Sequence, residues 1–178
     1  MNKNYPIYKT TFIDDMRSLV EEAAQNFSDS TAISYKENYW DKEVKKVSFT
    51  QWRDDVRHLG TALISCGLRE ESIAIVGENS YGWCCSFFGV MAIGAVTVPL
   101  DKELPAEELT DICRVAECSV VLYSAAIEKK MLYMKEHLEG VKTWICIGNT
   151  EPTVTEGITP LKSIVSDGAR RFAAGDNT

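Results

Sequence analysis

The sequence lacks the short motifs that mark several large enzyme classes. No G-x-G-x-x-G follows a predicted strand, no G-x-x-x-x-G-K-[ST] phosphate loop occurs, and no G-x-S-x-G elbow is present. The missing glycine fingerprint disfavours a nicotinamide or flavin dinucleotide site. Without G-x-S-x-G, the sequence lacks the turn that presents the nucleophilic serine of α/β-hydrolases. Enzyme chemistry is therefore not visible in a single motif.

Basic residues and long apolar runs are also scarce. Lys and Arg number 19 against 26 Asp and Glu, which gives a formal net charge of −7. Such a charge argues against a nucleic-acid partner and against docking on an anionic membrane surface. No apolar run reaches the roughly 18 residues of a transmembrane helix, and the N-terminus has no apolar signal region. We therefore expect a cytoplasmic protein without a transmembrane segment.

The cysteines lack the spacing of metal or redox motifs. No C-x-x-C pair occurs, and Cys84 and Cys85 are adjacent, which prevents them from pairing with each other. The expectation is buried free thiols in a reducing compartment. The six cysteines are Cys66, Cys84, Cys85, Cys113, Cys118 and Cys146.

The stretch 72–101 carries the strongest structural signal. A β-branched run at 73–76 predicts a buried parallel strand, and a helix that is apolar nearly all round follows at 83–93, capped by Asn79 or Ser80. A second β-branched run at 96–98 is stopped by Pro99. Strand, helix and strand with short joints make a right-handed βαβ unit. The fold class is therefore α/β, with a doubly wound parallel sheet.

Hydrophobic periodicity predicts the remaining elements. A small β-hairpin near the N-terminus is formed by strands at 32–35 and 44–49, and further strands are expected at 120–123 and 144–147. Asp14 or Asp15 is the predicted cap of the first helix and Thr50 that of the second. The segment 168–178 is expected to fray. The predicted helices cover 11–27, 51–66, 105–116, 126–138 and a last one beginning at Pro160.

Only a few residues are candidates for a site. Glu78 and Asn79 follow the central strand 73–76, at the edge where open α/β sheets bind ligands, although loop bonding and helix capping explain them as well. His58 and His137 are predicted to lie at the surface or its boundary, without a nucleophile placed beside them. The acidic pairs Asp54–Asp55, Glu70–Glu71 and Glu107–Glu108 are interpreted as solvated charges rather than metal ligands.

Several segments, taken in order, resemble a known family. VSFTQW at 47–52 is a loose match to a core motif of the type L-T-Y-x-E-L, and MAIGAVTVPLD at 91–101 is close to a motif in which an apolar helix runs into G-A-x-x-V-P-L. ENSYGW at 78–83 is similar to a segment of long-chain fatty acyl-CoA ligases, and 104–124 is similar to the continuation of the family. From about residue 11 to 148 the chain thus resembles the N-terminal part of the AMP-forming acyl-CoA synthetases, in the adenylate-forming superfamily.

The resemblance implies an activity for a longer protein. Such an enzyme activates a carboxylic acid, here leaning towards fatty acids, with ATP and Mg²⁺, releases pyrophosphate, and transfers the acyl group from acyl-AMP to coenzyme A. The family's phosphate loop, of the type T-S-G-T-T-G-x-P-K-G, its ribose-binding aspartate and its C-terminal lysine have no counterpart before the chain ends at Thr178. No catalytic, cofactor-binding or metal-binding residue is therefore carried over, and no cofactor is assigned to this chain.

The resemblance also implies a domain organisation and partners. Residues 1–148 are expected to form the N-terminal subdomain, and 149–178 a connecting loop and helix leading towards the phosphate loop. The expected partner is the remainder of the synthetase, and the surface it would cover predicts association of this chain into homo-oligomers. This interpretation makes the chain a fragment, inactive by itself.

Two alternatives stay open. A free-standing interaction or regulatory module could have kept the fold without the catalysis. A generic nucleotide-binding domain of flavodoxin-like topology rests on the strand and helix pattern alone, and it lacks a glycine-rich phosphate loop.

Overall fold

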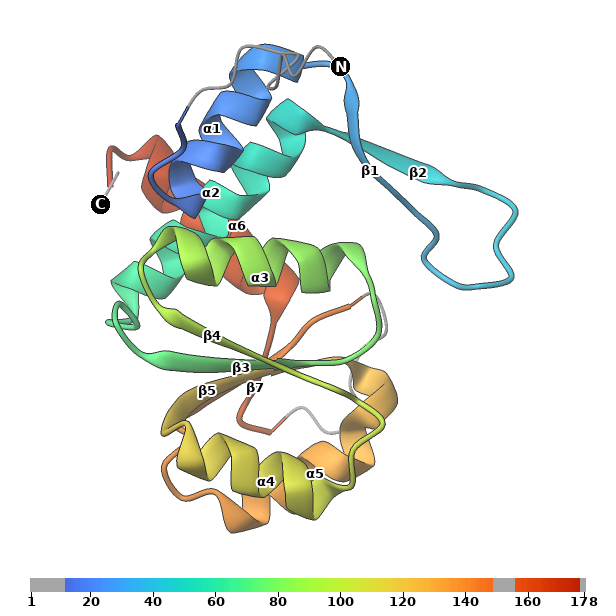
Figure 1. The fold of residues 1–178 in the computed structure, drawn as a ribbon, viewed down its shortest axis with the longest axis vertical. Helices are drawn as coiled ribbons and strands as arrows, with labels where there is room; N and C mark the ends of the chain where they lie inside the picture. Colours follow the sequence, from blue (N-terminus) through green and yellow to red (C-terminus); the bar gives the residue numbers. More distant parts are fainter. Residues whose placement is uncertain (1–11, 149–155, 177–178) are drawn as a thin grey trace, which may run out of the picture.

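The protein is built on a five-stranded parallel sheet. The computed structural model describes residues 12–148 and 156–176. The strands lie in the order β4-β3-β5-β6-β7, and every neighbouring pair is parallel (Figure 1). Their bounds are β3 Ser72–Val76, β4 Val96–Leu100, β5 Cys118–Tyr123, β6 Thr143–Cys146 and β7 Ile158–Pro160.

Helices cover both faces of this sheet. Helices α2 (Phe49–Ser65), α3 (Tyr81–Ala92) and α6 (Leu161–Ala173) pack on one face, and α4 (Ala106–Val115) and α5 (Glu128–His137) pack on the other (Figure 1). A short 3-10 helix, η1 (Ala125–Ile127), leads into α5. Residues 120–123 of β5 alternate between the two apolar cores, as the pleat of a strand requires. The prediction of a doubly wound α/β fold is confirmed.

The N-terminal elements form an outer layer and a hairpin. Helix α1 (Met16–Phe27) packs on α2 and α3, away from the sheet, and the antiparallel strands β1 (Thr31–Tyr35) and β2 (Lys45–Ser48) project from the body (Figure 1). Asp15 caps α1, as one of the two predicted alternatives, because its carboxylate accepts a hydrogen bond from the Ser18 N–H at 2.7 Å. Strands β1 and β2 pair antiparallel, so the predicted hairpin is present.

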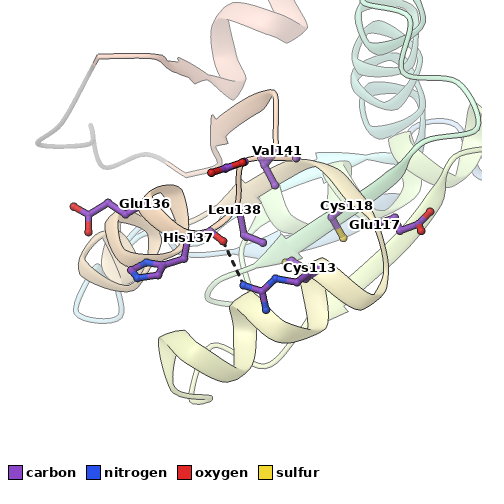
Figure 2. Close-up of a pocket in the computed structure, with 10 residues that line it drawn as sticks. Cys113, Glu117, Cys118, Glu136, His137, Leu138 and Val141 are labelled. Carbon is purple, nitrogen blue, oxygen red and sulfur yellow. Dashed lines mark hydrogen bonds between the residues drawn. The ribbon is translucent and has the colours of Figure 1, made fainter.

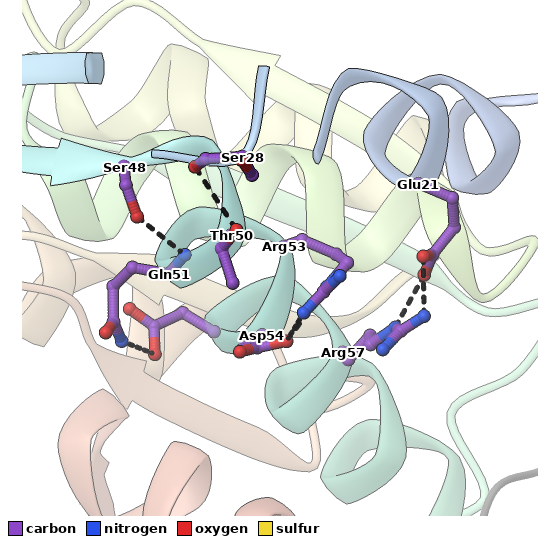
Figure 3. A network of polar contacts seen from close by, with 9 residues as sticks. Glu21, Ser28, Ser48, Thr50, Gln51, Arg53, Asp54 and Arg57 are labelled. Carbon is purple, nitrogen blue, oxygen red and sulfur yellow. Dashed lines mark hydrogen bonds and ion pairs between the residues drawn. The ribbon is translucent and has the colours of Figure 1, made fainter. Parts of the chain in front are cut away.

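The cap of α2 differs from the prediction. Ser48, rather than Thr50, caps this helix, because the Ser48 hydroxyl accepts a hydrogen bond from the Gln51 N–H at 3.2 Å (Figure 3). The Thr50 hydroxyl instead donates to the Ser28 carbonyl at 3.2 Å, which ties α2 to the end of α1. Ser48 and Thr50 are both of the residue type that caps helices, so tertiary contacts decide which of them caps α2.

Strand β4 continues through Pro99, whereas the sequence predicted that this proline stops it. Pro99 lies opposite Ile75 of β3 in the parallel register. Proline is compatible with this place because β4 is the edge strand of the sheet, where one side of the strand has no ladder bonds to make. The prediction therefore ended the strand two residues too early.

The C-terminal part completes the sheet and one helical layer. Strand β7, which the periodicity did not predict, pairs with β6, and α6 packs tightly on α2. The prediction that the chain frays from residue 168 onwards was wrong up to Ala173, since α6 is helical to that residue. Residues 149–155 and 177–178, part of the predicted connecting loop and tail, lie outside the described residues. In the part that the structure describes, no helix combines the length and apolar character needed to cross a membrane.

Candidate functional site

The carboxyl edge of the sheet is the candidate ligand-binding region. The chain passes from β3 through α3 to β4 on one side, and then from β4 through α4 to β5 on the other side of β3. The strand order therefore reverses around β3, and helices leave β3 and β4 on opposite faces. In open α/β sheets a crevice for ligands forms outside the strand ends at such a switch point.

Two loops come into direct contact at this switch point. The Ser124 N–H, just after β5, donates to the Val76 carbonyl at 3.1 Å, and the Ser124 hydroxyl donates to the Glu78 carboxylate. A Cβ on Gly77 would lie 2.7 Å from the Ser124 Cβ, so only glycine permits this approach. The backbone hydrogen bond from Ser124 to Val76 and the close approach of Gly77 therefore fix the position of the Glu78–Ser124 pair.

Charged groups lie on the adjacent loop after β4. The Lys102 ammonium hydrogen-bonds to the Glu103 carboxylate at 2.6 Å, and this bond, with the charges of Glu78 and Asp101 nearby, raises the pKa of Lys102. The Lys130 ammonium, from α5, donates to the backbone carbonyl of Lys102 at 2.6 Å. The loop is thus bound to α5. The residues just named include three carboxylates, Glu78, Asp101 and Glu103, and two ammonium groups, Lys102 and Lys130.

The two residues predicted at this edge have different surroundings. Glu78 is half-buried and bridges two loops, which is more than the loop bonding that the sequence indicated. Asn79 is exposed, and the cap of α3 is Ser80, whose hydroxyl accepts from the Trp83 N–H at 3.1 Å. Sequence reasoning missed Ser124. Its signal was a small polar residue directly after the next buried strand.

The predicted histidines lie apart from each other and from this edge. His58 is half-buried on α2, where its ring packs edge-on against Phe172 of α6 at 5.8 Å between centroids. His137 is exposed at the end of α5, with Nδ1 bonded to the Tyr133 carbonyl at 2.7 Å. Their prediction as surface or boundary residues is confirmed.

Of the six carboxylates in the acidic pairs, Glu70, Glu107 and Glu108 are exposed, and Asp54, Asp55 and Glu71 are half-buried. Glu107 and Glu108 are exposed in the first turn of α4. Asp55, however, accepts a hydrogen bond from the Tyr81 hydroxyl at 2.6 Å, so it ties α2 to α3 and is not simply solvated. The Arg57–Glu21 ion pair ties α2 to α1 (Figure 3). Within residues 12–148 and 156–176, no three His, Cys, Asp or Glu side chains are grouped to hold a metal ion.

Two cavities lie elsewhere on the molecule. One, of about 660 Å³, lies among α1, α2, α3 and α6 and includes the Arg57–Glu21 ion pair in its wall. The other, of about 490 Å³, lies at the amino edge of the sheet between α4 and the α5–β6 loop (Figure 2).

Four cysteines are buried as predicted, but Cys66 is exposed and Cys84 is half-buried, so the prediction was wrong for these two. Cys66 is exposed because α2 ends there, at the turn into β3.

Comparison with known proteins decides the family. Residues 20–168 match the family model described as AMP-binding enzyme. The chain belongs to the AMP-binding enzyme family. The resemblance seen in the sequence, to the N-terminal part of adenylate-forming ligases, is confirmed.

Relatives of the chain are ligases and multidomain synthetases. It is 25% identical over 121 residues to 4-hydroxybutyrate–CoA ligase 2 of Metallosphaera sedula, which covers 67% of this chain and 21% of the relative. It is 35% identical over 82 residues to the hybrid PKS-NRPS synthetase mycA of Thermothelomyces thermophilus, 46% of this chain and 2% of that protein. The chain thus spans about a fifth or less of these two relatives.

Solved structures share the fold. The anthranilate CoA ligase AuaEII, crystallised with anthranoyl-AMP, superposes with a TM-score of 0.76 at 19% identity, over 88% of this chain and 29% of that one. A long-chain-fatty-acid-CoA ligase from Archaeoglobus fulgidus superposes with a TM-score of 0.74 at 18% identity, over 91% and 33%. The fold is that of the N-terminal subdomain of adenylate-forming enzymes.

The family implies the use of ATP, but the turn after β3 does not fit a triphosphate. A phosphate cradle needs open backbone N–H groups beside a glycine. At Gly77 the space that such a cradle would leave open is filled by Ser124, and the next residue is the carboxylate Glu78, which would repel phosphate. We therefore derive no reaction step through ATP at this edge.

Proposed function

We propose that this chain is the first subdomain of an AMP-forming carboxylic acid–CoA ligase. In the proposed enzyme the acid is joined to AMP from ATP, with Mg²⁺, and the acyl group then passes to coenzyme A. The match of residues 20–168 to the AMP-binding family, with a fold shared by CoA ligases, is the observation that carries the proposal. The role of this chain is to provide scaffold for catalytic segments that other parts of the protein contribute.

The packing of the family-like segments supports a scaffold role. The motif-like stretch 91–101 forms the end of α3 and strand β4, and the segment 47–52 forms the start of α2. Both contribute to the cores rather than to a reactive cluster: Trp52 packs against α1 and α3, and Ile93 and Ala95 pack against the sheet. The division proposed from the sequence, with 1–148 as subdomain and 149–178 as connection, places β7 and α6 in the connecting part, although both pack with the sheet.

We propose a fatty acid as the acyl substrate of the longer enzyme. ENSYGW at 78–83 is similar to a segment of long-chain fatty acyl-CoA ligases, and the relatives include a long-chain-fatty-acid–CoA ligase of Mycobacterium tuberculosis at 28% identity over 81 residues. Other relatives include peptide synthetases, such as the nonribosomal peptide synthetase tpzA of Aspergillus terreus, so amino acids belong in the test. A cytoplasmic location accords with this proposal.

Pyrophosphate exchange tests where the chemistry lies. The 178-residue chain and the product of its complete genomic reading frame are assayed in parallel for carboxylate-dependent ATP–pyrophosphate exchange, with hexadecanoate, benzoate and a mixture of amino acids. We expect exchange with hexadecanoate by the longer protein and none by the 178 residues. Reactions without carboxylate are the control.

Each other result changes the proposal. Exchange by the 178-residue chain alone would refute the scaffold role. Exchange by the longer protein only with benzoate or amino acids would refute the fatty-acid substrate but keep the ligase. A reading frame that stops after codon 178, with no exchange, would replace the ligase by the interaction-module alternative, and binding partners would then be sought.

A further inference from the structure

The cavity at the amino edge of the sheet contains two thiols from adjacent elements. Cys113 lies in the last turns of α4 and Cys118 is the first residue of β5, and both line this cavity (Figure 2). Both belong to the same apolar core beneath α4 and α5. This edge is opposite to the one that carries Glu78 and Ser124, so the pair is independent of the proposed ligase function.

The turn between the two cysteines places both of them in the wall of this cavity. Helix α4 ends at Val115, and Glu117 adopts a left-handed conformation with φ of 52°, which reverses the chain into β5. Figure 2 shows the Cys118 sulfur pointing from the sheet towards α4, where Cys113 lies. Hydrogen bonding between the two thiols lowers the pKa of Cys118 and raises the pKa of Cys113.

We propose that Cys113 and Cys118 form a peroxide-sensitive dithiol, in which Cys118 is oxidised first and Cys113 completes a reversible disulfide. The oxidant is hydrogen peroxide or an organic hydroperoxide, which enters through the cavity. Of the six cysteines in the chain, Cys113 and Cys118 line this cavity together.

The roles of the two thiols follow from their surroundings. Cys118 is 4% exposed and Cys113 is 0% exposed, so Cys118 is the one nearer to the solvent of the cavity. The hydrogen bond donated by Cys113 stabilises the Cys118 thiolate and lowers the pKa of Cys118. A thiolate is the reactive form towards peroxide. In contrast, burial raises the pKa of Cys85 to about 12, which keeps that thiol unreactive.

The reaction balances with peroxide as the only added reagent. The Cys118 thiolate attacks the terminal peroxide oxygen and the O–O bond breaks, which leaves Cys118 as a sulfenic acid. The leaving hydroxide takes a proton to become water, or, with an organic hydroperoxide, the leaving alkoxide takes a proton to become an alcohol. The Cys113 sulfur then attacks the Cys118 sulfur, the S–S bond forms, and the S–O bond breaks. The departing hydroxide takes the Cys113 proton as a second water. The two sulfurs lose two electrons, and peroxide gains them.

Peptide mapping of the full chain tests the proposal without a mutation. Trypsin cleaves after Arg114 and after Lys129, so it separates Cys113 in peptide 103–114 from Cys118 in peptide 115–129. After mild peroxide treatment and alkylation, we expect these two peptides to be joined, with a mass two hydrogens below their sum. Dithiothreitol should release them. Without peroxide, both should be found separately and alkylated.

Variants then assign the order of the steps. Cys66→Ser is the matched control, because this exposed cysteine lies at the end of α2, away from the cavity, and its loss should leave the linked peptide unchanged. In Cys113→Ser, a dimedone adduct should accumulate on Cys118. In Cys118→Ser, Cys113 should remain unmodified. Near-ultraviolet circular dichroism verifies that each variant is folded.

The overturning results are equally definite. If the linked peptide does not form in the folded wild-type chain, or if Cys118 is oxidised no faster than Cys85, the dithiol is disproved. A linkage that involves Cys66 instead would also disprove it. We expect Cys118 to react faster than Cys85, because its thiolate is the more populated.

Discussion

Replacing Gly168 by alanine tests the packing of the C-terminal helix. Gly168 lies on α6 where this helix crosses α2, and it is buried. A Cβ at this position would lie 1.7 Å from the His58 carbonyl oxygen and 2.6 Å from the His58 carbonyl carbon. Both atoms belong to the backbone of α2, so no side-chain rotation can relieve the contact. In Gly168→Ala, helix α6 must move away from α2.

The magnitude follows from two opposing effects. Alanine gains about 1 kcal/mol over glycine in a helix interior. Overpacking a tight contact costs about 1–3 kcal/mol or more, and a contact this short against backbone belongs at the upper end. Separation also loosens the contact of Leu161 and Ile164 with the sheet core. We expect a net loss of about 2 kcal/mol in the free energy of unfolding, which lowers the melting temperature of a chain of this size by about 4–8 °C.

The assay is urea unfolding followed by circular dichroism, with thermal melts in parallel. Gly140→Ala is the matched control, because a Cβ at Gly140 meets nothing within 4 Å, and its stability should change by less than about 0.5 kcal/mol. Trypsin cleavage after Arg170 should also become faster in Gly168→Ala if α6 detaches locally. Equal or greater stability of Gly168→Ala would refute the reasoning, since it would show that α6 does not lie this close to α2.

Four further predictions concern the other contacts. Gly77→Ala should cost about 2 kcal/mol by overpacking, and Ser124→Gly in the same chain should recover part of it; equal stability of the single and double variants would contradict the close approach. Tyr81→Phe should cost about 1 kcal/mol in urea unfolding, because it removes the hydrogen bond to Asp55, and an unchanged midpoint would show that the bond is not formed. Burial raises the pKa of Cys85 from 9.0 to about 12, so the unfolded chain loses its proton first and stability should fall as the pH rises from about 9 towards 12; Cys85→Ala should flatten this slope, and an unchanged slope would exclude Cys85 as its source. Sedimentation velocity at increasing concentration should show self-association through the exposed apolar side chains, and a monomer at all concentrations would contradict it.

The elements with strong periodicity were predictable from the sequence, but their ends and neighbours were not. The buried strand β3 and the apolar helix α3 have unambiguous patterns, and their predicted positions agree with the structure within a few residues. Strand β7 was missed because its three residues, with a proline among them, carry no periodicity of their own. It is a strand because β6 offers an unpaired edge beside it.

Of the hydrogen-bonded pair at the carboxyl edge of the sheet, only Glu78 could be placed from the sequence. The pattern of β3 placed Glu78 at the carboxyl edge, because side chains after a parallel strand must lie there. That Ser124, 46 residues further along the chain, is its hydrogen-bond partner depends on which strand pairs beside β3. Local pattern does not encode strand order, so this contact needed the tertiary structure.

The sequence by itself determined the α/β class and the central βαβ unit, because both follow from local hydrophobic periodicity. It also determined the family, because motifs of consecutive residues carry the resemblance. Tertiary structure alone decided the strand order, the close crossing of α6 over α2 at Gly168, and the placement of Cys113 and Cys118 in the wall of one cavity. The physical reason is the same in all three. Each depends on how separate elements pack, and a side chain's pattern along its own element does not specify the surface that it will meet.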